Sequence, residues 1–236
     1  MKLSARLEKI IDLVDSTSVI ADIGTDHGYI PIELLIREKI NYAILADINR
    51  GPLENASREV ESHGLIDKVD LRLGSGLEIL KEGEVDQVII AGMGGILISD
   101  LIEKKIDLCK KLDKLVLQPM QAQGELRKYL NTRGFSIVDE YLVKEDFRIY
   151  EIMVVEYSGL TKNIDEIYYE VPKKLIDKKD PLLNDFLDKK LGENRNILKK
   201  LEESIVSNGE SMSVLERKKT IESKIEKLEK MYNIEC

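Results

Sequence analysis

Residues 19–31 read VIADIGTDHGYIP, and they are the most informative part of the chain for its architecture. The apolar start of this stretch is typical of a buried strand. A tight polar turn then contains Asp22, Gly24, Asp26 and Gly28, and helix-forming residues follow the turn. Glycine lets the backbone approach a ligand closely, and the first turn of a helix offers free N–H groups. The stretch therefore predicts a strand, a ligand-binding loop and the start of a helix.

The loop has the spacing Asp-x-Gly-x-Asp-x-Gly, which differs from the dinucleotide-binding pattern Gly-x-Gly-x-x-Gly. Asp26 stands where a second glycine would be expected. An acidic loop suits a pyrophosphate poorly and better suits a ligand with an ammonium or sulfonium cation, such as S-adenosylmethionine. A purely structural strand-to-helix turn with solvated acids would use the same residues, so both interpretations stay open on this loop alone.

Composition narrows the class of protein. The 236 residues suffice for one α/β domain with an appendage or for two small domains. We expect a cytoplasmic protein without a membrane span, because no apolar run approaches about 18 residues and the first 16 residues do not resemble a secretory signal. Cys109, Cys236 and two histidines predict neither a disulfide framework nor a metal site.

The net charge limits the kinds of partner that the protein is expected to bind. The value of −8 argues against an indiscriminate nucleic-acid binder, and no DNA partner is expected. The charge is uneven, because residues 161–236 are neutral and the whole acidic excess lies before them.

Short apolar runs alternate with helical patterns over the first 160 residues. Strands are expected from residue 19, at 42–46, 69–73, 85–91 and 114–117, and helices at 3–15, 30–39, 52–63, 96–106 and 123–132. Two β runs, 135–144 and 148–157, then follow each other without a helix. This order predicts a parallel, doubly wound sheet closed by a hairpin whose last strand is antiparallel to its neighbours. The combination resembles the Rossmann-like, seven-stranded class I methyltransferase fold.

The tail, residues 161–236, has a different character. Residues 161–180 are interpreted as a linker with a short helix, and apolar residues then recur every three or four positions. Asn208-Gly209 interrupts this pattern, which resumes behind a capping box of Ser213 and Glu216. Two helices joined by a short turn predict an antiparallel coiled-coil hairpin. The expected domains are therefore 1–160, a ligand-binding α/β domain, and 161–236, a helical coiled-coil domain.

Two further strand ends carry residues suited to an adenosyl group. Asp47 ends the second strand, where a carboxylate can accept hydrogen bonds from both ribose hydroxyls. Gly74-Ser75-Gly76 ends the third strand and is placed for the adenine. Taken singly, Asp47 could be a helix N-terminal acid and the glycines a simple turn. Their joint placement at successive strand ends favours a ligand site.

The sequence AGMGG, residues 91–95, follows the fourth strand. Many nucleic-acid base methyltransferases carry Asn/Asp-Pro-Pro-aromatic at this position, and neither the prolines nor the aromatic residue is present here. The glycines leave room for a flat base, and Met93 could press on its face. A glycine-rich helix entry that packs closely on the sheet is the alternative.

Together these motifs resemble the bacterial tRNA (adenine(22)-N1)-methyltransferase family, TrmK, over essentially the whole chain. They are ADIGTDHGYIP at 21–31, ADIN at 46–49, GSGL at 74–77, AGMGG at 91–95 and LQPM at 117–120, followed by the helical tail. The resemblance implies S-adenosylmethionine as methyl donor, S-adenosylhomocysteine as product, no metal, and N1 of an adenine in the D-arm region of tRNA as acceptor.

The resemblance also implies a role for each motif. The cofactor-binding residues would be Asp22, Gly24, Thr25 and Gly28 at the methionine end, Asp47, Ile48 and Asn49 at the ribose, Gly74, Ser75 and Gly76 at the adenine, and Ala91, Gly92 and Met93 at the methyl group. Asp26 is the candidate carboxylate for the charge formed on the base, with His27 and Tyr29 as base-positioning neighbours. Asp26 could instead bind the methionine ammonium.

Three questions stay open. A class I methyltransferase acting on a small molecule or a protein, or a non-catalytic adaptor that binds S-adenosylmethionine, would need the same cofactor residues. The protein is expected to be a monomer or a weak dimer. Basic residues could form a phosphate-binding track, or they could belong to a solvated coiled coil. They are Lys173-Lys174, Lys178-Lys179, Lys189-Lys190, Lys199-Lys200 and Arg217-Lys218-Lys219 in the tail, with Arg127, Lys128, Arg133 and Arg148 before it.

Overall fold

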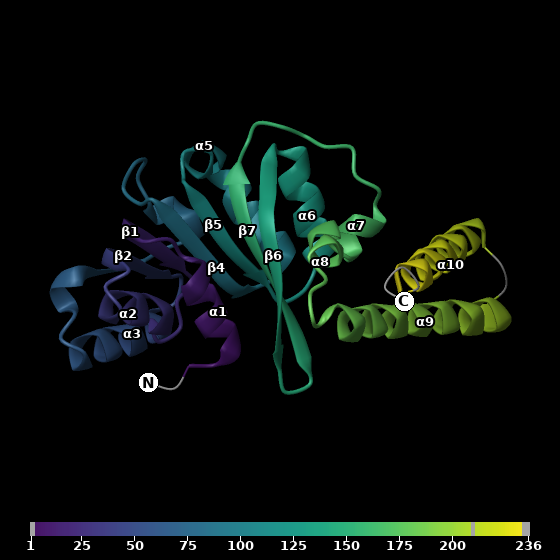
Figure 1. Ribbon diagram of the computed structural model, residues 1–236, viewed down its shortest axis with the longest axis horizontal. Coiled ribbons are helices and arrows are strands. Elements are labelled where there is room, and N and C mark those ends of the chain that lie inside the picture. Colours follow the sequence, from purple (N-terminus) through teal and green to yellow (C-terminus); the bar gives the residue numbers. More distant parts are fainter. Residues whose placement is uncertain (1–2, 209–210, 233–236) are drawn as a thin grey trace. The chain divides into compact units, whose positions relative to one another are not determined.

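The computed structural model describes residues 3–208 and 211–232 (Figure 1). It divides into two compact units, of which the first ends at Asn163 and the second begins at Ile164. Gly209, in the expected turn between the two long helices, and Cys236 lie outside the described residues.

A seven-stranded sheet forms the centre of the first unit, in the order β3-β2-β1-β4-β5-β7-β6. The strands are β1 Thr17–Ile23, β2 Ile40–Asp47, β3 Val69–Leu73, β4 Gln87–Met93, β5 Lys114–Pro119, β6 Phe135–Glu145 and β7 Arg148–Tyr157. The first five strands pair in parallel. As predicted, β7 is antiparallel to its neighbours, β5 and β6. The predicted class I methyltransferase fold is therefore confirmed.

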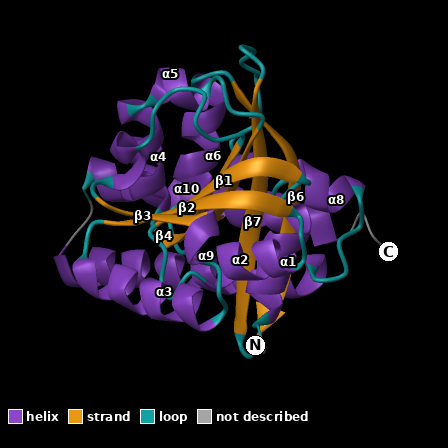
Figure 2. Cartoon of the chain, turned by 90° about the vertical axis from the view of Figure 1, so that its left-hand side faces the viewer, coloured by secondary structure: helices purple, strands orange, loops and turns teal. Residues whose placement is uncertain are grey.

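Helices cover both faces of this sheet, with α1, α2 and α3 on one face and α4, α5 and α6 on the other (Figure 2). Their bounds are α1 Ala5–Leu13, α2 Tyr29–Ile36, α3 Arg50–Ser62, α4 Gly95–Lys104, α5 Ile106–Cys109 and α6 Gln123–Thr132. The helix predicted at 96–106 ends slightly earlier, at Lys104, because Lys105 has φ −128° and ψ 36° and leaves the helical conformation, and α5 is a separate short helix that was not predicted.

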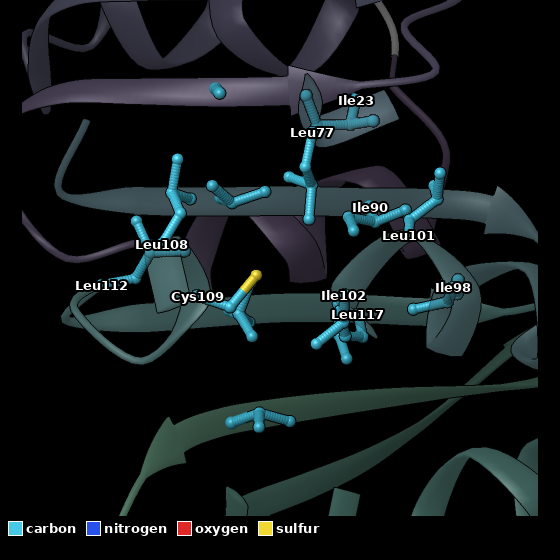
Figure 3. Packing of buried hydrophobic residues seen from close by; sticks show 14 of the residues in the cluster. Ile23, Leu77, Ile90, Ile98, Leu101, Ile102, Leu108, Cys109, Leu112 and Leu117 are labelled. Atoms are coloured by element: carbon cyan, nitrogen blue, oxygen red, sulfur yellow. The ribbon is translucent and has the colours of Figure 1, made fainter. Parts of the chain in front are cut away.

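Each face of the sheet buries an apolar layer. Figure 3 shows the layer under α4 and α5, where Ile90 and Leu117 of the strands meet Ile98 and Ile102 of α4. Cys109 lies in the same layer, and burial raises the pKa of its thiol to about 12. This cysteine is therefore a small core residue without thiolate reactivity at neutral pH.

In the described part of the second unit, residues 164–208 and 211–232, there are two short and two long helices. They are α7 Ile167–Glu170, α8 Lys173–Asp177, α9 Leu183–Asn208 and α10 Met212–Tyr232. The two long helices pack as the predicted hairpin. Ion pairs from Lys218 to Glu202, 3.0 Å, and from Arg195 to Glu229, 2.8 Å, give them an antiparallel register.

Two predictions for this tail were wrong in detail. The segment before the hairpin holds two short helices rather than one. The capping box of Ser213 and Glu216 does not form, because α10 begins at Met212 and the hydroxyl of Ser211 accepts the N–H of Val214 at 3.4 Å. A serine two positions earlier therefore caps the helix.

None of the helices described is long and apolar enough to cross a membrane.

Candidate active site at the carboxyl ends of the parallel strands

The loop after β1 is fastened to the end of β2. The N–H groups of Gly24 and Thr25 both donate to the carbonyl of Ala46, at 2.8 and 3.0 Å. Gly28 directly precedes α2 as its N-cap residue, and its backbone has a left-handed conformation with φ +66°. A Cβ on Gly28 would lie 2.7 Å from Leu45 Cδ2, so only glycine fits both the conformation and the space.

The same loop also touches the end of β4. Gly24 has φ +76°, and a Cβ added to it would lie 2.1 Å from Cε of Met93. The predicted methionine-end loop and the predicted methyl-group loop are therefore neighbours. The missing side chain of Gly24 leaves room for the end of the Met93 side chain.

Asp22 is buried beneath this loop, with 6% of its surface exposed. The pKa of Asp22 is raised to about 6, chiefly by burial and to a lesser extent by the charge of Asp47, while the Thr25 hydroxyl acts in the opposite direction. A buried carboxylate with such a pKa gains from a nearby cation. The site thus fits the ammonium group of a methionine moiety.

Asp47 and the turn after β3 are joined. The backbone carbonyl of Asp47 accepts a hydrogen bond from the N–H of Gly74 at 3.0 Å. The side-chain Oδ1 of Asp47 accepts a hydrogen bond from the N–H of Asn49 at 2.7 Å. Asp47 is half-buried, whereas Ile48 and Asn49 are exposed. The Asp47 carboxylate therefore lies beside the turn of Gly74, Ser75 and Gly76. An adenosyl group would need this arrangement if the carboxylate bound its ribose and the turn bound its adenine.

The turn of Gly74, Ser75 and Gly76 has a structural reason for its glycines as well. A Cβ on Gly74 would lie 2.2 Å from Ile79 Cγ2, and one on Gly76 would lie 2.3 Å from Leu101 Cδ2. Ser75 is half-buried between them. The turn is therefore tightly packed, whatever it binds.

Arg72 holds the segment that follows this turn, a role that the sequence did not predict. Its Nη1 donates to the carbonyl of Ile79 at 2.9 Å, and its guanidinium holds both oxygens of Glu84 at 2.8 and 2.5 Å. The pKa of Glu84 falls to about 2, chiefly because of these hydrogen bonds. The two side chains lie twelve residues apart, and no local pattern announces the pair.

The AGMGG loop combines both interpretations offered for it. Gly95 is packed, since a Cβ there would lie 2.2 Å from the carbonyl oxygen of Ala122. Gly92 is exposed with φ +82°, and a Cβ would meet nothing within 4 Å. The pairing of β4 with β5 is irregular between Ala91 and Met93. The helix entry therefore packs closely while the loop before it stays open.

Asp26, His27 and Tyr29 form a cluster on the surface of the first loop. His27 has φ +60°, unusual for a residue other than glycine, and its ring stacks on Tyr29 with centroids 5.1 Å apart and planes 10° apart. His27 Nε2 lies 3.5 Å from Asp26 Oδ1, and the side chain of Asp26 is 76% exposed. In contrast to Asp22, this carboxylate is open to an incoming substrate.

No group of three or more His, Cys, Asp or Glu side chains is placed to hold a metal ion within residues 3–208 and 211–232. The residues described at this edge offer carboxylates, backbone N–H groups, an imidazole and a phenol.

Comparison with known proteins agrees with this geometry. A family model described as a methyltransferase domain matches residues 3–153. The tRNA (adenine(22)-N(1))-methyltransferase of Bacillus subtilis is 38% identical over 156 residues, and that segment spans 66%, just under two thirds, of each protein. The crystal structure of the B. subtilis enzyme covers 98% of both chains at 29% identity with a TM-score of 0.86.

Two structures of relatives contain the cofactor or its product. A Streptococcus pneumoniae protein described as a putative tRNA (m1A22) methyltransferase, in complex with S-adenosyl-L-methionine, is 31% identical, with a TM-score of 0.81 over 98% of this chain and 99% of that one. TrmK of M. capricolum with S-adenosylhomocysteine is 27% identical, with a TM-score of 0.82 over 98% and 99%. The family resemblance of the motifs is confirmed, and the chain belongs to the S-adenosylmethionine-dependent tRNA (adenine(22)-N1)-methyltransferases.

Proposed function

We propose that this chain methylates N1 of adenine 22 in the D-arm region of tRNA, using the edge of the sheet described above. One observation carries the assignment of the site. Glycine-rich and acidic residues meet at the ends of β1, β2, β3 and β4, with Gly24 against Met93 and Asp47 against Gly74. This arrangement matches an extended adenosyl ligand that crosses several strand ends.

The family resemblance implies the cofactor roles, and the positions of the residues at the strand ends support them. Asp22, Gly24, Thr25 and Gly28 would hold the methionine end, Asp47, Ile48 and Asn49 the ribose, Gly74, Ser75 and Gly76 the adenine, and Ala91, Gly92 and Met93 the region of the methyl group. The exposed Ile48 offers an apolar face to the adenosyl group, and the second oxygen of Asp47 is available for a ribose hydroxyl. S-adenosylmethionine supplies an electrophilic methyl group when bound and leaves as S-adenosylhomocysteine.

The residues around the loop would then position the base. N1 of the adenine donates its lone pair to the methyl carbon, and the base becomes a cation. Asp26 stabilises that charge or accepts a proton from N6, and the stacked rings of His27 and Tyr29 give the base a flat neighbour. Most of the acceleration would come from alignment, for which effective molarities of about 10⁵ M are available.

Binding of tRNA needs basic residues outside the cofactor site. Lys173, Lys174, Lys189 and Lys200 are exposed in the second unit and suit phosphate contacts. Two candidates do not suit this role. Arg127 is buried between Glu140 and Glu151, and Lys190 is buried against the ring of Phe186. A tRNA substrate would place the reaction in the cytoplasm.

The test is transfer of labelled methyl groups from S-adenosylmethionine to an unmodified tRNA transcript. We expect label in the wild-type transcript and none when adenine 22 is changed to guanine. Binding of S-adenosylmethionine without transfer to any tRNA would instead favour the adaptor function. Transfer to a protein or a small molecule, but not to tRNA, would favour the other enzymatic function.

A further inference from the structure

We infer that the side-chain amide of Gln121 recognises the N6 and N7 edge of the target adenine and leaves N1 free for the methyl group. This inference rests on the proposed function and adds a specificity residue to it. Gln121 follows β5, outside the motifs that suggested the family.

The turn that carries Gln121 is fastened to the methyl-group loop. The N–H of Met120 donates to the carbonyl of Met93 at 2.7 Å, and the N–H of Gly95 donates to the carbonyl of Gln121 at 2.8 Å. These two hydrogen bonds hold the ends of β4 and β5 together. The backbone of Gln121 is therefore fixed relative to the open Gly92 loop.

The buried side chain of Gln118 makes a second set of contacts next to this turn. Gln118 is fully buried, its Nε2 donates to the carbonyl of Pro119 at 3.1 Å, and its Oε1 accepts from Nη1 of Arg6 at 2.6 Å. Ala122 adopts φ +55° directly after Gln121. The turn thus has a specific, unusual conformation supported by buried polar groups, which is typical of a functional loop.

The side chain of Gln121 lies over the glycine loop. A Cβ placed on Gly94 would lie 3.3 Å from Nε2 and 3.6 Å from Cγ of Gln121. The residue itself is exposed, so its amide can meet an incoming ligand. Next to it, Ile96 and Leu97 are exposed at 60% and 49% in the first turn of α4 and offer apolar contact to a ring.

The chemistry of a primary amide fits one edge of adenine. The carbonyl oxygen can accept from the N6 amino group while the N–H donates to N7, which is the bidentate pairing of glutamine with adenine. This pairing uses neither N1 nor its lone pair. Methylation of N1 makes N6 a stronger donor, so the hydrogen bond to the Gln121 oxygen becomes stronger as the reaction proceeds. Guanine presents an acceptor at position 6 and would face the same oxygen unfavourably.

The experiment combines a protein variant with a base analogue that lacks N7. Full-length wild type and Gln121→Ala are assayed on tRNA that carries adenine or 7-deazaadenine at position 22. We expect wild type to lose about tenfold in kcat/KM on the analogue, and Gln121→Ala to lose about tenfold on adenine with no further loss on the analogue. Affinity for S-adenosylmethionine, measured by calorimetry, should be the same in both proteins.

Two controls separate recognition from folding. Gln123→Ala removes a nearby amide that donates to the Pro119 carbonyl at 3.4 Å, and this variant should keep the full sensitivity to 7-deazaadenine. Gln121→Glu keeps an acceptor for N6 and loses the donor for N7, so it too should become insensitive to the analogue. Equal losses on the analogue for wild type and Gln121→Ala, or no loss for wild type, would overturn the inference. Wild type that methylates no tRNA at all would instead contradict the proposed function.

Discussion

The terminal methyl carbon of Met93 covers Gly24, at a point only 2.1 Å from where a Cβ of residue 24 would stand. Gly24 also has φ +76°, which L residues rarely adopt. The loop after β1 is therefore in close contact with the end of β4, and a side chain at residue 24 would displace the end of the Met93 side chain.

Gly24→Ala should lower both stability and affinity for S-adenosylmethionine, because the added methyl group meets Met93 and the backbone is strained. We expect a loss of about 1–3 kcal/mol in the free energy of unfolding, measured with urea. Met93→Ala, combined with Gly24→Ala, should recover only the part of the stability loss that comes from the steric clash. Gly64→Ala is the matched control, since Gly64 also has a positive φ, +67°, and a Cβ there would meet nothing within 4 Å. A neutral Gly24→Ala would show that the two loops are not coupled.

Asp47→Ala should weaken binding of S-adenosylmethionine by about 1–3 kcal/mol, through loss of charge-assisted hydrogen bonds to the ribose. Isothermal calorimetry measures this directly. Asp67→Ala, an exposed acid in the short helical turn before β3, should leave the affinity unchanged. An unchanged affinity in Asp47→Ala would contradict the ribose role.

Asp22 should make the protein less stable as pH rises. Its pKa is about 6 in the folded protein against 3.8 in a model peptide, so the folded state binds the proton more tightly. The stabilisation is complete below about pH 4 and is lost as pH rises through about 6, a change of about 3 kcal/mol. Asp22→Asn should flatten this part of the stability profile, and saturating S-adenosylmethionine should reduce the loss in wild type. If Asp22→Asn keeps the slope and the exposed Asp100→Asn removes it, the assignment is wrong.

Glu84 should have the opposite dependence. Hydrogen bonds from Arg72 lower its pKa from 4.5 to about 2, so its contribution is present above pH 4.5 and is lost as pH falls through about 2. Glu84→Gln should cost about 1–3 kcal/mol at neutral pH. The control is Glu82→Gln, whose partner Lys111 is exposed and whose loss should cost under about 1 kcal/mol. Equal costs for the two variants would show that the Arg72–Glu84 pair does not stabilise the segment after the turn of Gly74, Ser75 and Gly76.

Reversing the charges of Lys173 and Lys174 should weaken tRNA binding and leave S-adenosylmethionine binding unchanged. Both lysines are exposed at the start of α8. The salt dependence of tRNA binding should become shallower, by about one unit of slope for each phosphate contact that is lost. Lys68→Glu with Lys81→Glu changes the net charge equally in the first unit and serves as the comparison. An unchanged salt dependence would show that α8 does not contact tRNA.

Local signals predicted the elements of the fold well. The alternation of apolar runs and helical patterns placed β3 at residues 69–73 and α6 at 123–132, where the structure has them. Strand ends were less predictable, because they depend on distant partners. β4 and β5 continue to Met93 and Pro119, two residues past their predicted ends, since these residues pair with each other across the sheet.

The missed residues share a physical reason. Arg72 with Glu84 and Arg127 with its two glutamates join side chains from different parts of the chain, and the Gln121 side chain lies over the backbone of Gly94. A sequence pattern reports spacing along one element and cannot report such contacts. The glycine and acidic motifs were visible because each lies within one strand end, and the roles given to their residues stay predictions.

The coupling of Gly24 to Met93 also has a consequence for the order of events during synthesis. Met93 is made 69 positions after Gly24, and β1 pairs with β4 as well as with β2. A nascent chain that has emerged only as far as β3 has the acidic loop and Asp47 but lacks the strand that completes the edge. The two parts of this site are therefore synthesised one after the other, and the edge of β1 that pairs with β4 has no partner until β4 has been made.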